Sequence, residues 1–277
     1  MRSMFSNSRT RGVLCRTKHL RIEEETGRSP VTERQEQLAG FSQLALLAAK
    51  IILIGAGGLG GEIGEALVRK GIGFLTLLDD DVVEATNLNR QRFYEADLGK
   101  NKAVCLARTL AKEGFCGTEI RGYGLRLEEA IALGVDLSGS VAIVGIDNNP
   151  GRIAASTYFR RLSMPVVFTA VSETANNGYV FVQEASAESP CFGCMFTDAI
   201  DDKTYPCTPS VKDMLKVVAG ITVYAVDSLL MERKRFWNYK DEYLDGSVPG
   251  NSWQVEKRKE CQLCGAAQEE QHGGNHQ

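Results

Sequence analysis

Apolar residues in the middle of the chain fall into short, nearly continuous runs. These runs are found at residues 51–54, 74–78, 141–146, 165–171 and 178–182. A strand buried on both faces by helices has this pattern, whereas a strand with one face in water alternates apolar and polar residues. The sequence therefore predicts an α/β fold with a Rossmann-like, doubly wound and mainly parallel sheet.

Helices are predicted before, between and after these runs. Residues 33–47 carry apolar side chains at a helical spacing, so we expect one helix there with its apolar face on the core. These side chains are Leu38, Phe41, Leu44 and Leu47. Further helices are predicted at residues 102–113, from Pro150 onward, and at residues 211–233.

One domain, residues 31–264, is expected to contain all of these elements. Residues 1–30 are polar and mixed in charge, so we expect them to form a flexible arm. Residues 265–277 are expected to form a disordered tail.

A glycine-rich turn follows the first apolar run. Gly55, Gly57 and Gly60 have the G-x-G-x-x-G spacing, which permits a tight turn, close approach to a phosphate and close packing of the next helix. Asp79 follows the second apolar run, where a carboxylate can accept hydrogen bonds from ribose hydroxyls. The unit predicts an adenine-nucleotide site. Taken alone, it fits a nicotinamide or flavin dinucleotide best.

The polar segment at residues 82–103 changes that interpretation. It follows a strand end, where loops of this fold carry function. The side chains that can converge on phosphates are Asn87, Arg90, Gln91 and Lys102. A dehydrogenase has little use for so many polar and cationic groups beside the phosphates, so we expect ATP. The alternative is a solvated loop with ordinary charges.

Asp147 and Asn148 follow the run at residues 141–146, on the ligand edge of the predicted sheet. A carboxylate at this edge can hold Mg²⁺ that bridges phosphates. The alternative is that both residues cap the helix that starts at Pro150.

Four cysteines form two CxxC pairs, Cys191 with Cys194 and Cys261 with Cys264. Two such pairs predict a tetrahedral thiolate site for structural Zn²⁺ in the C-terminal part of the domain. A redox pair or buried incidental thiols are the alternatives. Cys207 differs, because it lies in the polar, proline-flanked segment DDKTYPCTPS, where we expect an exposed thiol.

Composition excludes several classes of protein. The net charge of −3, without a long basic run, gives no footprint for nucleic acid. No apolar stretch reaches the roughly 18 residues of a membrane span, and the start of the chain lacks the apolar core of a secretion signal, so we expect a cytoplasmic protein. All three histidines lie in terminal segments, which excludes a hydrolase triad in the folded core.

With these motifs assembled, residues 32–264 resemble the ThiF/MoeB/HesA family of ubiquitin-activating-enzyme-like adenylyltransferases. The motifs that match are ERQEQLAGF, GAGGLG, the acidic pair Asp79 and Asp81, NLNRQ, GKNKA, Asp147-Asn148 with Arg152, CFGCMF and CQLCG. The two residues before the first motif, Val31 and Thr32, differ from the Arg-Tyr pair that the family often has.

The resemblance implies roles for these residues. The glycine turn, with Gly58, would hold ATP, Asp79 and Asp81 would lie beside the ribose, and Asp147 would support Mg²⁺. The groups implied at the triphosphate are Asn87, Arg90, Gln91 and Lys102. Arg34 would reach the active site of the partner subunit of a homodimer; without the resemblance it is an exposed helix-surface charge. Cys207 lies near the family cysteine that forms a thioester or persulfide.

The implied activity is ATP-dependent adenylation of the C-terminal glycine of a ubiquitin-like or sulfur-carrier protein that ends in Gly-Gly. The attacking carboxylate is already ionised at pH 7, so no general base is needed, in agreement with the absence of core histidines. The alternatives are adenylation of a peptide or a tRNA-base carboxylate, a non-catalytic partner subunit, and a nicotinamide dehydrogenase. From the chain length we expect downstream steps to lie on other chains.

Overall fold

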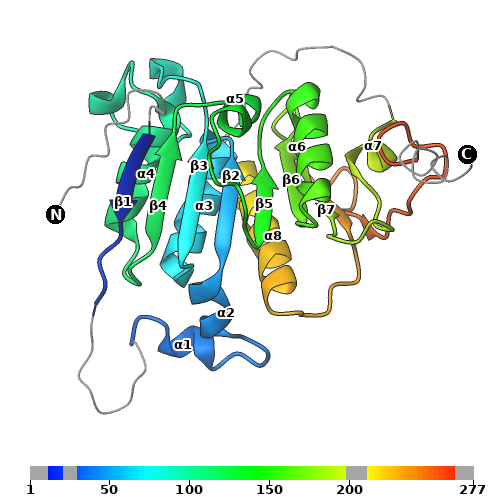
Figure 1. Ribbon diagram of the computed structural model, residues 1–277, viewed down its shortest axis with the longest axis horizontal. Helices are drawn as coiled ribbons and strands as arrows, with labels where there is room; N and C mark the ends of the chain where they lie inside the picture. Colours follow the sequence, from blue (N-terminus) through cyan, green and yellow to red (C-terminus); the bar gives the residue numbers. More distant parts are fainter. Residues whose placement is uncertain (1–11, 21–29, 198–210, 266–277) are drawn as a thin grey trace, which may run out of the picture.

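The structure, a computed structural model, describes residues 12–20, 30–197 and 211–265. Its centre is a nine-stranded sheet with the strand order β1-β4-β3-β2-β5-β6-β7-β8-β9 (Figure 1). The strands are β1 (Gly12–Arg16), β2 (Lys50–Ile54), β3 (Phe74–Leu78), β4 (Glu119–Tyr123), β5 (Val141–Val144), β6 (Val166–Val171), β7 (Asn177–Gln183), β8 (Tyr239–Tyr243) and β9 (Ser252–Trp253).

Five neighbouring strands, β4, β3, β2, β5 and β6, run parallel to one another. Antiparallel strands flank them: β1 on one side, and β7, β8 and β9 on the other. The predicted α/β fold with a mainly parallel, Rossmann-like sheet is thereby confirmed. The carboxyl ends of β3, β2 and β5 lie side by side, and this edge carries Asp79, the glycine turn and Asp147.

Helices cover both faces of the sheet. They are α1 (Glu33–Glu36), α2 (Gln43–Ala48), α3 (Gly58–Lys70), α4 (Lys102–Glu113), α5 (Leu127–Ala132), α6 (Asn149–Arg161), α7 (Phe192–Met195) and α8 (Lys212–Leu230), with short 3-10 turns η1 (Ala85–Asn87) and η2 (Glu95–Asp97). In the described residues, no helix has both the length and the apolar content needed to cross a bilayer.

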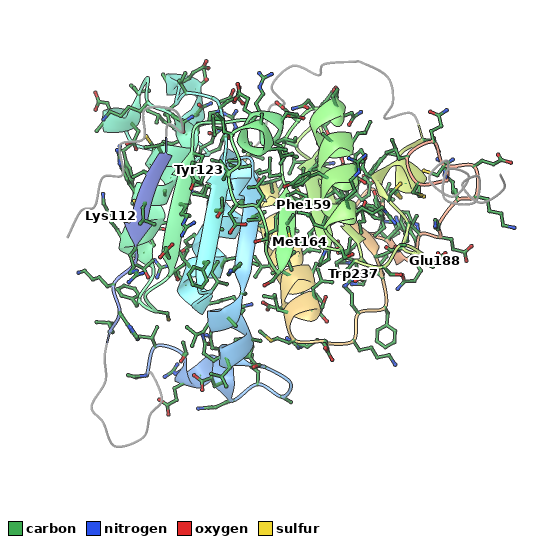
Figure 2. The ribbon with its side chains drawn as sticks, viewed as in Figure 1. Lys112, Tyr123, Phe159, Met164, Glu188 and Trp237 are labelled. Carbon is green, nitrogen blue, oxygen red and sulfur yellow. The ribbon has the colours of Figure 1, made fainter. Side chains whose placement is uncertain are left out.

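Strand β2 shows why the apolar runs are continuous. Ile51 and Leu53 belong to the core formed with α3, α4 and α8, whereas Ile52 and Ile54 belong to the core formed with α5 and α6. Phe159 of α6 is fully buried in the second core (Figure 2). Because helices cover both faces, every residue of the strand after Lys50 can be apolar.

The prediction of a single helix over residues 33–47 is wrong. Two short helices, α1 and α2, replace it, separated by Gly40 in the left-handed region at φ 74°. Ser42 begins the second helix by accepting a hydrogen bond from the Ala45 amide at 3.2 Å. Leu38 and Leu44, expected on the core, are 58% and 79% exposed, because the break rotates the expected face away from the sheet.

The amino-terminal residues 12–20 also differ from the expected flexible arm. Gly12–Arg16 forms β1, which pairs antiparallel with β4 at the edge of the sheet. Val13 and Cys15 pack against the core, so apolar burial and strand pairing together order this segment. Residues 1–11 and 21–29 of the predicted arm and residues 266–277 of the predicted tail lie outside the described residues.

Candidate functional site

The glycine turn joins β2 to α3 with little room for side chains. Gly55 has φ 98°, and a Cβ placed on it would lie 2.5 Å from the carbonyl oxygen of Gly145. A Cβ on Gly60 would lie 2.0 Å from the carbonyl oxygen of Gly55. The turn therefore requires glycine at both positions, and it presents the amino end of a 13-residue helix to the sheet edge.

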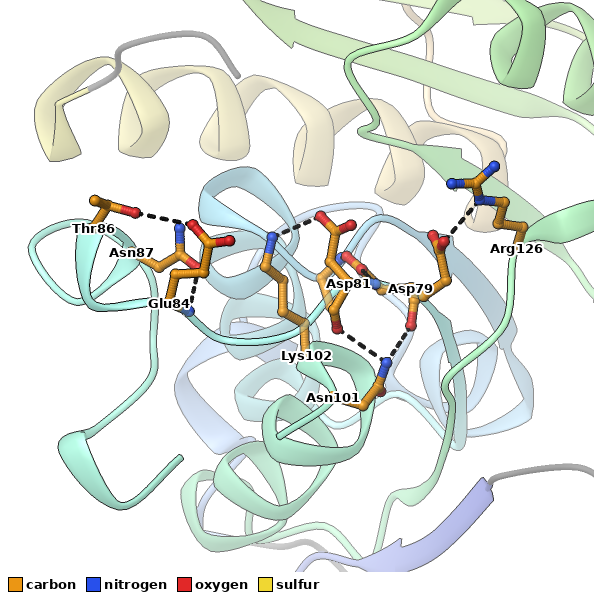
Figure 3. A network of polar contacts seen from close by, with 10 residues as sticks. Asp79, Asp81, Glu84, Thr86, Asn87, Asn101, Lys102 and Arg126 are labelled. Carbon is orange, nitrogen blue, oxygen red and sulfur yellow. Dashed lines mark hydrogen bonds and ion pairs between the residues drawn. The ribbon is translucent and has the colours of Figure 1, made fainter. Parts of the chain in front are cut away.

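Asp79 lies beside this turn, at the end of the neighbouring strand (Figure 3). Its Oδ2 accepts a hydrogen bond from the Ala56 amide at 2.6 Å, and its Oδ1 accepts one from the Asp81 amide at 2.9 Å. Burial raises its pKa to about 6, although these amides and the charge of Lys102 act in the opposite direction. The carboxylate is thus placed by backbone groups and partly desolvated.

Two cations pair with the acidic residues that follow. Lys102, the first residue of α4, lies 2.8 Å from Asp81, and Arg126 donates to Asp80 at 2.7 Å (Figure 3). Asn101 donates to the carbonyl oxygens of Asp79 and Asp81, and its own side-chain oxygen caps α4. Asn101 and Arg126 were not predicted for this site. An asparagine directly before a predicted helix is a capping signal that could have indicated the first.

The loop that carries Asn87, Arg90 and Gln91 uses part of its polar capacity internally. Asn87 is buried, and its side-chain oxygen accepts a hydrogen bond from the Glu84 amide. Arg90 is half-buried and donates to the carbonyl oxygen of Thr86 at 2.6 Å. Gln91 is buried with its Nε2 only 3.7 Å from the position of a Cβ on Gly57, and its Oε1 has no hydrogen-bond partner. The loop therefore lies against the glycine turn.

Asp147 and Asn148 separate into two roles. Strand β5 ends at Val144, earlier than predicted, and Asp147 is exposed in the loop beyond it. The side chain of Asn148 accepts a hydrogen bond from Gly151 at 2.8 Å and caps α6, as the alternative interpretation held for this residue. The carboxylate of Asp147 is not used in this cap, so it fits a cation ligand at the same sheet edge as the glycine turn.

Arg34 lies at the other end of the sheet. It is exposed on α1, and α2 connects that segment to the amino end of β2. The neighbouring strand is held at the same end, where the Phe74 amide donates to the Ala49 carbonyl. Arg34 therefore does not meet the glycine turn of its own chain. Cys207 lies outside the described residues.

The four cysteines of the CxxC pairs converge into one buried cluster. The Sγ atoms of Cys191 and Cys261, and those of Cys194 and Cys264, are 3.4 Å apart; Cys191 and Cys194 are 3.8 Å apart. Four thiolates bound to one Zn²⁺ lie about 3.8 Å from each other, so the cluster fits the ion.

The backbone favours the thiolate form of one of these four cysteines, whereas burial raises the pKa of Cys191 and that of Cys264. Although burial acts to raise it, the pKa of Cys261 is lowered to about 7 by hydrogen bonds from the amides of Leu263 and Cys264. The Arg258 amide also points at the sulfur of Cys194, at 3.4 Å. Loops 70 residues apart in sequence thus form one site, which the fold rather than a local hairpin assembles.

Comparison with known proteins places this arrangement in a family. The model of the ThiF family matches residues 32–265, most of the chain. The chain belongs to the ThiF family. The family expectation based on the glycine turn, the NLNRQ loop and the CxxC pairs is therefore confirmed.

Most of the curated relatives that the chain matches are longer than the chain. An adenylyltransferase and sulfurtransferase MOCS3 of Xenopus laevis is 34% identical over 205 residues, 68% of this chain and 45% of that protein. Ubiquitin-like modifier-activating enzyme 5 of Culex quinquefasciatus is 30% identical, over 62% of this chain and 48% of its own length. The SAMP-activating enzyme E1 of Haloferax volcanii is 29% identical, over 62% of both chains. The chain spans about half the length of most of the curated relatives it matches.

The fold is also found in solved structures. The crystal structure of E. coli MccB with ATP has a TM-score of 0.71 at 21% identity, covering 87% of this chain and 75% of that one. At this identity the likeness concerns the fold.

Proposed function

We propose that the chain adenylates the C-terminal carboxylate of a ubiquitin-like or sulfur-carrier protein ending in Gly-Gly, using ATP. The observation that carries the proposal is the contact between the glycine turn and Asp79, with Lys102 beside them, at one sheet edge. Family membership and the activating-enzyme names of the relatives support it.

Each side chain then has a part in holding ATP. Asp79 accepts hydrogen bonds from the ribose hydroxyls, and the α3 amino end faces the phosphates. The groups at the triphosphate are Asn87, Arg90, Gln91 and Lys102. Arg90 and Lys102 counter charge on the leaving pyrophosphate, since Lys102 can exchange its pairing with Asp81 for a phosphate.

Asp147 is the proposed ligand of Mg²⁺. A bound Mg²⁺ ion would neutralise phosphate charge during the transfer. The partner carboxylate attacks the α-phosphorus, pyrophosphate leaves, and an acyl-adenylate results. The attacking group is already ionised at pH 7, so no side chain has to remove a proton.

The proposed roles of Arg34 and Cys207 extend beyond the described residues of one chain. Because Arg34 lies at the opposite end of the sheet from its own glycine turn, it would serve the nucleotide site of a second copy in a homodimer. Cys207 would accept the acyl group from the adenylate. Zn²⁺ held by the four clustered cysteines would have a structural part, since the two pairs follow β7 and β9, which β5 and β6 separate from β2 and its glycine turn.

A peptide carboxylate is the second candidate substrate. The specific support is the fold shared with MccB, whose solved structures include complexes with ATP and with MccA peptides. ATP:pyrophosphate exchange separates the candidates. We expect exchange with a folded Gly-Gly-ended protein and none with short peptides. Exchange with short peptides alone would favour the second candidate, and no exchange with any carboxylate would contradict the proposed function.

A further inference from the structure

The side chain of Arg92 leaves the phosphate-facing loop directly after Arg90 and Gln91, and enters a cluster of three carboxylates. Its Nη2 donates to Glu113 at 2.6 Å, while its Nη1 lies 3.7 Å from Glu62 and 3.9 Å from Glu65. Glu113 ends α4, whereas the other two glutamates belong to α3. One guanidinium therefore ties this loop to two helices.

The aliphatic part of Arg92 is fitted to the start of α3. A Cβ on Gly61 would lie 3.0 Å from its Cγ and 3.2 Å from its Cδ. Gly61 directly follows Gly60 of the glycine turn, so Arg92 covers the first turn of the helix whose amino end faces the candidate nucleotide site. A Cβ at position 61 would require the Arg92 side chain to shift by a few tenths of an ångström, so glycine suits this close packing.

Charge rather than complete hydrogen bonding holds this cluster together. Glu62 Oε1, Arg92 Nε and Glu113 Oε2 are buried and have no hydrogen-bond partner. Two of the glutamates have a second cation: Arg69 lies 2.5 Å from Glu65, and Lys212 lies 3.6 Å from Glu62. Glu113 depends on Arg92, so removing the guanidinium leaves a largely buried carboxylate uncompensated.

We propose that Arg92 is a positioning residue, which holds the loop so that Arg90 and Gln91 face the phosphates of ATP. The inference rests on the proposed function for the identity of the ligand. The site suits arginine, since its planar fork spans carboxylates on two helices, whereas lysine supplies only a point charge. Gln91 directly precedes Arg92 and is buried against the glycine turn. A shift of Arg92 would therefore also shift Gln91 relative to this turn.

Two variants separate positioning from stability. Arg92→Leu should lower the thermal midpoint and weaken ATP binding by about 10- to 100-fold, because a loop shift of about 1 Å misplaces its ligand-facing groups. The double variant Arg92→Leu with Glu113→Leu removes the uncompensated charge, so its thermal midpoint should recover while ATP binding stays weak. Arg92→Lys should give intermediate ATP affinity.

The control is the salt bridge between Arg235 and Glu184, in which the arginine side chain is only 7% exposed. It lies beyond the far end of α8, so Arg235→Leu with Glu184→Leu should retain wild-type ATP affinity. Recovery of both stability and ATP affinity in the Arg92 and Glu113 double variant would overturn the inference, as would wild-type affinity in Arg92→Leu.

ATP binding can be measured by calorimetry without an acyl partner, so this test does not depend on the proposed adenylation. Wild-type protein that binds ATP but exchanges no pyrophosphate would contradict the proposed function while the Arg92 series still supports or overturns this inference. Wild-type protein that does not bind ATP would contradict both.

Discussion

The carboxylate of Asp79 accepts a hydrogen bond from the backbone amide of Ala56, 2.6 Å away, and so connects the ends of β3 and β2. This contact places a partly desolvated carboxylate at the sheet edge, next to the glycine turn. Burial raises the pKa of this carboxyl, because it outweighs the two amides that favour the charged form.

ATP affinity should depend on the ionisation of Asp79. Its pKa is raised from 3.8 to about 6, and the ionised form accepts from the ribose. Affinity should therefore be close to full from about pH 7 upward and fall as the pH drops through about 6, where half of the carboxyl is ionised. Calorimetry at several pH values tests this. ATP titrates in the same range, so the ratio of wild-type affinity to that of Asp79→Asn is the informative quantity. A ratio independent of pH would contradict the role of Asp79.

Gly60→Ala should abolish ATP binding and lower the thermal midpoint. Its new Cβ would meet the Gly55 carbonyl at 2.0 Å, and a backbone atom cannot move away without opening the turn. Gly220→Ala on α8 is the control, because no atom lies within 4 Å of its Cβ position; it should stabilise the helix by about 1 kcal/mol. Wild-type ATP affinity in Gly60→Ala would show that ATP does not use this turn.

The cysteine cluster should hold about one zinc per chain. Cys264→Ser should reduce the zinc content measured by atomic emission and lower the thermal midpoint, because a four-thiolate site loses one ligand. Cys15→Ser, on edge strand β1, serves as the control and should leave the zinc content unchanged. Metal-free wild-type protein with undiminished stability would exclude a structural zinc site.

Cys207→Ser should keep pyrophosphate exchange but lose a covalent adduct. In the proposed step the Cys207 thiolate attacks the acyl carbon, a thioester forms, and AMP leaves with the electron pair of the broken bond. Exchange precedes that step and needs only the nucleotide site. A gel without reducing agent should show a thiol-sensitive adduct for wild type alone. Its absence in wild type would make the adenylate itself the product.

The sequence alone predicted the nucleotide half of the fold well. Strand β3 and helix α4 have the predicted bounds, because two-sided burial and a capping asparagine leave strong local patterns. The four clustered cysteines were also found by spacing. In each case a local sequence signal and the tertiary environment agree.

The remaining differences have tertiary causes. Gly40 breaks the helix predicted at residues 33–47, and the apolar spacing across it continues by coincidence. Strand β1 owes its order to pairing with β4, a segment that was itself not predicted. The contacts of Arg92 with Glu113 and of Arg126 with Asp80 join residues 21 and 46 positions apart, and spacing in the sequence gives no sign of them.

The most direct test of the account is the mass of the partner protein after incubation with ATP and Mg²⁺. A Gly-Gly-ended partner should gain one AMP on wild-type enzyme, whereas the same partner with an amidated C-terminus should gain none. Asp147→Ala should lose this product by about 100-fold or more at an unchanged thermal midpoint, since its carboxylate is exposed. Equal AMP transfer to the amidated partner, or undiminished transfer by Asp147→Ala, would contradict carboxylate adenylation at this site.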